Sequence, residues 1–305
     1  MEYVLLIIGI GLLVIGGSYL VKSAVGLANR FKISPLLIGV TIVSFGTSAP
    51  ELIVSIQATV DGTPGIAIGN IIGSNIANIG LVLGLTIAIR PVLINRKKYL
   101  TSWIAMLISS LMFFGFSMDG EIDSTEGLFL VAGLIAFITL SIRYMKQEVS
   151  IDETQLNLKP LKILFYFILG SLGLYCGSEM LISSAVSIAQ QWGVSEFIIG
   201  VTIVALGTSL PELATSLVAS IRGENSISLG NLLGSCVFNI FAVLGITSLV
   251  KPIPVDFFLV FVDLPIMLGF VILLGLFMFL NKKMGIVEGI ALLLAYCTYI
   301  GYSFI

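Results

Sequence analysis

Apolar stretches long enough to cross a membrane alternate with short polar breaks along the whole chain. Because about 20 mainly apolar residues in a helix cross roughly 30 Å of hydrocarbon, we predict ten membrane-spanning helices. They cover residues 3–25, 33–60, 65–89, 99–118, 126–146, 161–189, 196–221, 226–250, 253–280 and 285–304. The expected fold is an all-α integral membrane protein with its helices broken near the membrane midplane.

Composition supports this interpretation and excludes several others. Of the 305 residues 57% are hydrophobic and only 10% are charged, which excludes an ordinary soluble domain. Histidine is absent, and the three cysteines lie in apolar segments without CxxC spacing, so neither a disulfide framework nor a zinc site is supported. The first apolar stretch lacks a basic start and a small-residue cleavage site, so we expect a retained helix.

The basic residues test the predicted orientation. If the spans alternate in direction, one side of the membrane collects 14 of the 15 basic residues, and only Lys251 falls on the other side. The 14 are Lys22, Arg30, Lys32, Arg90, Arg96, Lys97, Lys98, Arg143, Lys146, Lys159, Lys162, Arg222, Lys282 and Lys283. The positive-inside rule places this side in the cytoplasm. We therefore expect a multi-pass protein of the plasma membrane with both termini outside the cell.

The chain contains the same polar motifs twice, 161 residues apart. GVTIVSFGTSAPELIVS at 39–55 returns as GVTIVALGTSLPELATS at 200–216, with 12 of the 17 positions identical. GNIIGSNIAN at 69–78 likewise returns as GNLLGSCVFN at 230–239. Five predicted spans, an odd number, separate equivalent points, so the second copy crosses the membrane in the opposite direction. Inverted halves of this kind are typical of secondary transporters that bind their substrate near the midplane.

This repeat defines the expected organisation of the chain. Residues 1–146 form the first inverted repeat with spans 1–5, and residues 161–305 form the second with spans 6–10. Residues 147–160 form a short cytoplasmic linker between them.

Each copy places a glutamate directly after a helix-breaking sequence. Pro50 has no amide hydrogen and its ring clashes with the carbonyl of Gly46, so the helix is expected to break or kink there. Carbonyl oxygens freed by the break must line a polar cavity or be buried against protein. Thr47 and Ser48 precede Glu51 by four and three residues, which gathers hydroxyls, carbonyls and a carboxylate on one helix face.

The second copy repeats this arrangement with Thr208, Ser209 and Glu212. No Lys or Arg is near either glutamate in sequence, which argues against a buried structural ion pair. Two carboxylates surrounded by neutral oxygens suit a hard cation, and Ca²⁺ takes about 6 to 8 oxygen ligands. The motifs therefore predict a calcium site made from both halves.

The following helix of each half adds further oxygen ligands. Ser74 and Asn78 are four residues apart on one helix face, and Ser235 and Asn239 repeat the pair. Neutral oxygens of this kind beside a carboxylate suit Na⁺.

Taken together, GTSAPE with GNIIGSNIAN and GTSLPE with GNLLGSCVFN resemble the motifs of the cation/calcium exchanger superfamily, and within it the sodium/calcium exchangers of compact prokaryotic type. The resemblance covers nearly the whole chain. It implies an antiporter that exchanges Na⁺ for Ca²⁺ by alternating access, with the first and sixth helices sliding across a core of the others. It also implies ions as the only substrates, no cofactor, no enzymatic activity and no nucleic-acid partner, in a protein that functions as a monomer in the lipid bilayer.

The resemblance assigns a role to each matching residue. Glu51 and Glu212 match carboxylates that bind both calcium and sodium, and Thr47 and Thr208 match residues that bind calcium through backbone carbonyls. Hydroxyls of the sodium sites are matched by Ser48, Ser74, Ser209 and Ser235, and backbone oxygens of the sodium sites by Ser44 and Ala205. Asn78 and Asn239 match the amide pair near the centre of the cluster.

Three alternatives stay open. Potassium-dependent relatives carry aspartate where this chain has Asn239, and the proton-coupled branch reads GN where both copies here read GT before the glutamate. Both differences favour Na⁺ as the coupling ion over a K⁺-dependent or a H⁺/Ca²⁺ exchanger. A cation channel would use the same oxygen ligands but needs no mobile helices. Glu179 and Asp263 also lie within predicted spans, and we leave both outside the site.

Overall fold

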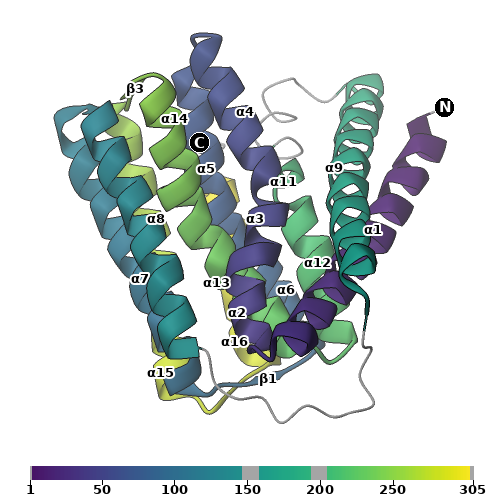
Figure 1. The fold of residues 1–305 in the computed structure, drawn as a ribbon. Helices are drawn as coiled ribbons and strands as arrows, with labels where there is room; N and C mark the ends of the chain where they lie inside the picture. Colours follow the sequence, from purple (N-terminus) through teal and green to yellow (C-terminus); the bar gives the residue numbers. More distant parts are fainter. Residues whose placement is uncertain (1, 146–157, 194–204, 303–305) are drawn as a thin grey trace.

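A computed structural model describes residues 2–145, 158–193 and 205–302 (Figure 1). The described part of the chain is almost entirely helical, with two short two-stranded sheets formed by segments that connect helices. Most of the linker predicted at 147–160 and the first part of the span predicted at 196–221 lie outside the described residues.

Helices of the N-terminal part follow one another in a simple order. They are α1 (Glu2–Phe31), α2 (Pro35–Ile38), the π-helix η1 (Gly39–Val43), α3 (Ser44–Thr47), α4 (Ala49–Val60), α5 (Pro64–Ala77), the π-helix η2 (Asn78–Leu83), α6 (Gly84–Ile89), α7 (Arg96–Phe116), the 3₁₀-helix η3 (Ser117–Asp119) and α8 (Ser124–Met145).

The C-terminal part begins with the longest helix. Its elements are α9 (Pro160–Gln191), α11 (Ala205–Gly207), α12 (Leu210–Ile221), α13 (Asn225–Phe238), the π-helices η5 (Asn239–Leu244) and η6 (Leu259–Asp263), α14 (Gly245–Val250), α15 (Leu264–Leu280) and α16 (Ile286–Tyr302).

Seven of the described helical segments are long and apolar enough to cross a membrane, and the bent pair 35–47 and 49–60 brings the number to eight. Helices α12 and α16 are apolar but shorter. The prediction of an all-α membrane protein is therefore confirmed, whereas the full number of ten spans stays a prediction.

Element boundaries repeat at the spacing found in the sequence. Helices α4, α5 and α6 begin 161 residues before α12, α13 and α14, as Ala49 and Leu210 illustrate, and strand β1 (Val92–Leu93) has the same relation to β3 (Ile253–Pro254). The π-helical turns η2 and η5 have the same relation, starting at Asn78 and Asn239. The duplication therefore extends from the motifs to the local backbone structure.

Two small antiparallel ribbons tie the parts of the chain together. Strand β1 (Val92–Leu93) pairs with β4 (Lys283–Met284), and β2 (Glu121–Ile122) pairs with β3 (Ile253–Pro254). Each ribbon joins one strand from the first half to one from the second, so the two halves are linked at both ends of the helices.

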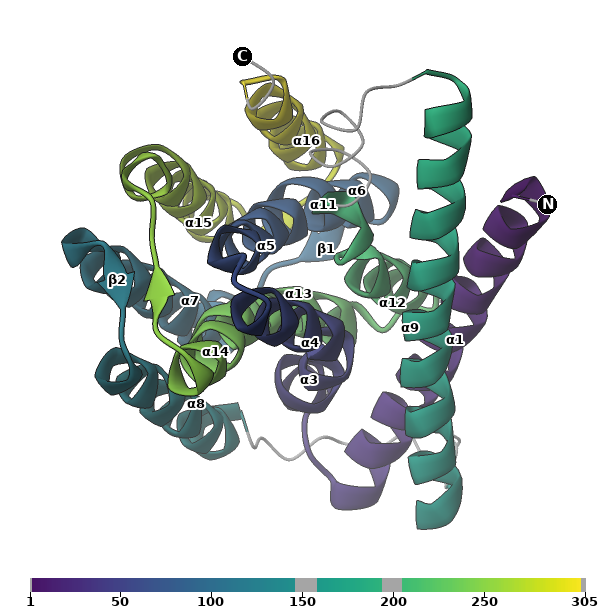
Figure 2. The ribbon, with the colours of Figure 1, turned by 90° about the horizontal axis from the view of Figure 1, so that it is seen from above.

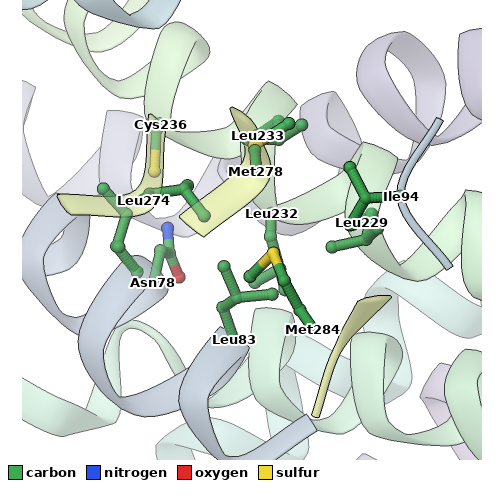
Figure 3. Close-up of a pocket in the computed structure, with 11 residues that line it drawn as sticks. Asn78, Leu83, Ile94, Leu229, Leu232, Leu233, Cys236, Leu274, Met278 and Met284 are labelled. Carbon is green, nitrogen blue, oxygen red and sulfur yellow. The ribbon is translucent and has the colours of Figure 1, made fainter. Parts of the chain in front are cut away.

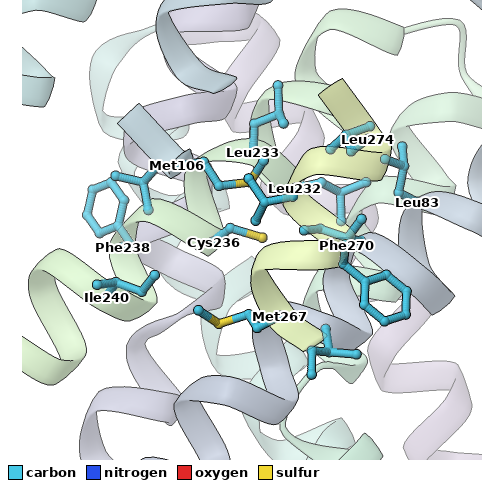
Figure 4. Close-up of a cluster of buried hydrophobic side chains, with 14 of the residues drawn as sticks. Leu83, Met106, Leu232, Leu233, Cys236, Phe238, Ile240, Met267, Phe270 and Leu274 are labelled. Carbon is cyan, nitrogen blue, oxygen red and sulfur yellow. The ribbon is translucent and has the colours of Figure 1, made fainter. Parts of the chain in front are cut away.

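Helix α13 lies near the centre of the molecule (Figure 2) and packs against α2, η1, α3, α7 and α12. Every residue from Ile227 to Phe238 is buried, which is unusual for a helix with so many small and polar side chains. Leu232, Leu233, Cys236 and Phe270 belong to the apolar cluster that packs around it (Figure 4). This core fixes the helices that carry the duplicated motifs.

Helices α1 and α9 lie side by side and cross at one flank of the core (Figures 1 and 2). Glycines bring their backbones together: a Cβ atom added at Gly16 would lie 2.7 Å from the backbone nitrogen of Leu174, and one at Gly170 would lie 2.7 Å from that of Leu20. Small residues allow such close contact between membrane helices. The two helices therefore pack as a pair.

Candidate ion-binding site

The predicted breaks occur at the two glutamates. Helices α2, η1 and α3 end at Thr47, α4 begins at Ala49, and the two helical segments differ in direction by 42°. The hinge residues Ser48 and Ser209 have nearly the same backbone angles, with φ of −88° and −86°. Proline at the second helical position lacks an amide hydrogen that would be unpaired there anyway, so it suits the start of α4 and α12.

Glu51 and Glu212 each lie in the first turn of their half-helix, and neither side chain is exposed to solvent. The amides and the dipole at a helix N-terminus favour a negative charge at this position. The two carboxyl groups are also close enough to interact electrostatically. The fold therefore concentrates negative charge at one buried point.

Side chains from the two halves meet around these carboxyl groups. The Ser48 hydroxyl donates to Glu212 Oε1 at 3.2 Å, and the hydroxyls of Ser74 and Thr208 lie 3.2 Å apart. Thr47 Oγ1 lies 3.3 Å from Ser235 Oγ. Every one of these contacts joins one half to the other. The structure thus brings together residues that the repeat had identified separately.

Several buried oxygens have no hydrogen-bond partner among the described residues. They are both carboxylate oxygens of Glu51, Oε2 of Glu212, Oγ of Ser209, Oδ1 of Asn239 and Oδ1 of Asn78. Buried polar atoms are almost always paired in proteins, because an unpaired one costs free energy. Carboxylate, amide and hydroxyl oxygens are the ligands of hard cations, so bound Ca²⁺ or Na⁺ would satisfy this set.

Two asparagines that sequence reasoning missed support the half-helices. Asn70 Nδ2 donates to Ser55 Oγ at 3.1 Å and to the backbone oxygen of Glu51 at 3.3 Å. In the other half, Asn231 Nδ2 donates to Ser216 Oγ at 3.0 Å. The signal was present, because the asparagine follows the first glycine in both GNIIG and GNLLG.

Another missed residue is Asn75, which orients the predicted ligand Asn239. The Asn239 amide nitrogen donates to Asn75 Oδ1 at 3.4 Å, while Asn75 Nδ2 donates to Met267 Sδ at 3.6 Å. This leaves Asn239 Oδ1 as the unpaired atom. The counterpart of Asn75 in the second half is Cys236, so the repeat gave no indication of its role.

The remaining predicted ligands are placed less directly. The Ser44 hydroxyl donates to the backbone oxygens of Gly39 at 2.8 Å and Asn231 at 2.9 Å, so it joins η1 to α13. Asn78 lines a mainly apolar pocket with Cys236 and leucines of α13 (Figure 3). Ala205 begins α11, next to the part of the chain outside the described residues. Their roles as ligands stay predictions.

Comparison with known proteins identifies the family. The model of the sodium/calcium exchanger protein family matches residues 1–143 and 162–305. The chain belongs to the sodium/calcium exchanger family. It is therefore a Na⁺/Ca²⁺ antiporter, and the resemblance seen in the repeated motifs is confirmed.

Individual proteins match over most or nearly all of their length. The sodium/calcium exchanger MaX1 of Methanosarcina acetivorans is 29% identical over 98% of this chain and 97% of its own. The inner membrane protein YrbG of Escherichia coli is 34% identical over 83% of this exchanger and 81% of its own chain. A solved structure of the sodium-calcium exchanger NCX_Mj, soaked with Na⁺ and Ca²⁺, superposes with a TM-score of 0.86 at 31% identity over 98% of this exchanger and 97% of that chain.

Proposed function

We propose that the exchanger binds Ca²⁺ and Na⁺ at one shared site centred on Glu51 and Glu212. The observation that carries the proposal is the set of buried, unpaired oxygens at these two residues. Ser48, Ser74 and Thr208 complete the site across the boundary between the halves. The other predicted ligands would join when ions fill the cluster.

Charge compensation explains why such a site exchanges ions. A bare carboxylate near the membrane midplane costs at least about 2.5 kcal/mol, so two uncompensated glutamates disfavour a closed, empty carrier. One Ca²⁺ or several Na⁺ would neutralise them and permit the closed state. Because either ion allows the transition, the gradient of one ion drives transport of the other. A channel would need no such closed intermediate.

The finer topology belongs to the same proposal. We infer ten membrane crossings in two inverted five-helix halves, 1–146 and 161–305, joined by a cytoplasmic linker at 147–160. The identical spacing of α4–α6 and α12–α14 supports this repeat, and so do the ribbons that join one half to the other. In this arrangement α12 forms the second half of a broken span whose first half ends with α11, which explains the short length of α12.

The two halves differ in how their first helix packs, which supports alternating access. A Cβ atom added at Gly17 of α1 would lie 3.2 Å from the backbone of Ala214, so α1 packs against α12. Ile53, which lies 161 residues before Ala214 on α4, is 58% exposed, so α9 does not cover α4 at the equivalent point. We place the protein as a monomer in the plasma membrane, with its basic side in the cytoplasm. In that orientation α12 lies toward the cytoplasm and is covered by α1, whereas α4 lies toward the outside and is uncovered, so the ion site faces outward.

Na⁺ is the proposed coupling ion. Both copies read GTS before the proline and glutamate, and position 239 carries an amide whose nitrogen is held by Asn75. The free amide oxygen of Asn239 suits a monovalent cation. Because the side chain is an amide, it adds no further carboxylate that could bind K⁺ or take up a proton.

Transport into proteoliposomes tests the proposal. Vesicles loaded with Na⁺ and diluted into Na⁺-free buffer should take up radioactive Ca²⁺, whereas vesicles carrying only a proton gradient should not. Glu51→Gln and Glu212→Gln should each abolish this uptake while the purified protein still folds. Glu121→Gln is the matched control, because Glu121 is an exposed carboxylate in strand β2. Full Na⁺-dependent uptake in either site variant would overturn the proposed site.

A further inference from the structure

Two basic residues occupy equivalent positions where a helix gives way to a strand. Arg90 follows α6 and Lys251 follows α14, and they are 161 residues apart. Both adopt an extended backbone, with φ of −135° and −158°. Helix, cation and strand therefore follow the same order in both halves.

Their side chains make equivalent contacts with the opposite half. Arg90 Nη1 donates to the backbone oxygens of Ser220 at 2.8 Å and Ile221 at 2.6 Å, at the end of α12. Lys251 Nζ donates to the backbone oxygen of Thr59 at 3.4 Å, at the end of α4. Thr59 and Ser220 are themselves 161 residues apart. Each cation thus binds the C-terminus of the other half's short helix.

The position of Lys251 makes this contact informative. It is the only basic residue predicted on the outer side of the membrane, where the positive-inside rule disfavours a cation. The inverted repeat explains its location: the counterpart of a cytoplasmic cation must lie at the outer side if it is to bind the equivalent helix end. Orientation alone gives no reason for a cation there.

The helices that receive these contacts are the ones that carry the site. Helices α4 and α12 have Glu51 and Glu212 in their first turns and end at Val60 and Ile221. The last carbonyls of a helix lack partners within it, and the negative end of the helix dipole favours a cation. At about 1.5 Å of rise per residue, the eight residues from Glu51 to Thr59 span about 12 Å. A shift of the helix end therefore moves the carboxylate by a similar amount.

We propose that Arg90 and Lys251 are positioning residues, which brace α12 and α4 against the opposite half and so set the separation of the two site carboxylates. Two carboxylates together neutralise one Ca²⁺, whereas each Na⁺ needs only one of them. Loss of a brace should therefore weaken Ca²⁺ more than Na⁺. Arg90 makes two short contacts and Lys251 one longer contact, so the effect should be larger at Arg90.

Kinetics of the reconstituted exchanger test these roles. Arg90→Gln should raise the KM for Ca²⁺ about fivefold while the KM for Na⁺ changes less than about twofold, a size consistent with loss of a cation at a helix C-terminus. Lys251→Gln should act in the same direction with a smaller change. Arg90→Lys should recover most of the Ca²⁺ affinity, because it restores a cation at the carbonyls. Lys251→Arg should match or exceed the wild-type affinity.

Lys98 provides the control. Its ammonium donates to Ser226 Oγ at 2.7 Å in the first turn of α13, so it joins the two halves on the basic side through a helix other than α4 and α12. Lys98→Gln should leave the ratio of the two KM values unchanged. Equal changes in both KM values, or a lower rate and stability with both KM values unchanged, would overturn the positioning role. If Arg90→Gln does not fold, the Arg90→Lys and Lys251→Gln variants decide by the same ratio.

This inference rests on the proposed ion site, and its failure can be distinguished from failure of that site. Ca²⁺ uptake that survives Glu51→Gln would refute the proposed ion site. A normal KM ratio in the Arg90 and Lys251 variants, with Glu51→Gln inactive, would refute only the positioning role of Arg90 and Lys251.

Discussion

The contact between α1 and α9 allows a sharp prediction about Gly16. Replacing Gly16 with alanine adds one methyl group to α1 where the backbone of α9 leaves no room. The added Cβ would lie 2.7 Å from the nitrogen of Leu174 and 2.9 Å from the oxygen of Gly170. Both atoms belong to helix backbone, so neither can turn aside as a flexible side chain could.

The size of the effect follows from these distances. Ordinary contacts of a Cβ atom begin near 3.4 Å, so the two helices must separate locally by about 0.7 Å. A gap of that size forfeits about a quarter to a half of the dispersion energy of the contacts around it. Overpacking of this kind typically costs about 1–3 kcal/mol, so we expect the Gly16→Ala protein to unfold at a temperature several degrees lower.

Gly11 supplies the control on the same helix, because a Cβ added there meets no atom within 4 Å. Thermal unfolding of the two alanine variants in detergent should therefore show a loss of stability for Gly16→Ala and none for Gly11→Ala. Transport should fall with stability only in the first variant. If both variants unfold at the same temperature, the close packing of α1 on α9 does not stabilise the protein and the reasoning is wrong.

Two further predictions concern selectivity and conformational preference. Asn239→Asp adds a carboxylate to the cluster and should make Ca²⁺ transport depend on pH or K⁺; an unchanged ion dependence would remove the argument from that position. Arg222 donates to the backbone oxygen of Ser18 at 3.1 Å and also to its hydroxyl, whereas the counterparts of this pair are two acids, Asp61 and Glu179. Arg222→Gln should loosen α1 from α12, and Asp61→Arg with Glu179→Ser should instead favour closure of α9 onto α4. Hydrogen exchange of the α4 and α12 amides would detect both shifts, and unchanged exchange would count against them.

Sequence reasoning succeeded where the chemistry is local or duplicated. The breaks before Glu51 and Glu212 follow from proline and glycine placed in a helix, and the structure confirms both. The contact of Ser48 with Glu212 agrees with the duplication, because both residues belong to polar motifs repeated at one offset, which we predicted to form one site. The same reasoning predicted the all-helical fold from the length of the apolar stretches.

It failed where a contact depends on one copy alone or on the backbone. Asn75 orients Asn239, but its counterpart in the second half is Cys236, so a comparison of the two halves did not identify Asn75 as a site residue. Arg90 was assigned only to the basic side of the membrane. Its partner is a backbone carbonyl, which every residue type has, so the sequence does not indicate the contact. The π-helical turns that begin at Asn78 and Asn239 were also missed, because no local residue pattern marked them.

The difference between the two halves has a physical origin that the repeated motifs could not contain. In the proposed inverted topology, two copies with closely similar polar segments would allow two equivalent arrangements, one with each half closed, and the motifs do not choose between them. The choice must come from positions that the repeat did not keep. Ser18 and Arg222 form a hydrogen-bonded contact where α1 meets α12, while their counterparts Glu179 and Asp61 would place two negative charges together where α9 would meet α4. The unduplicated residues therefore bias the exchanger toward the arrangement in which α1 is packed and Ile53 stays exposed.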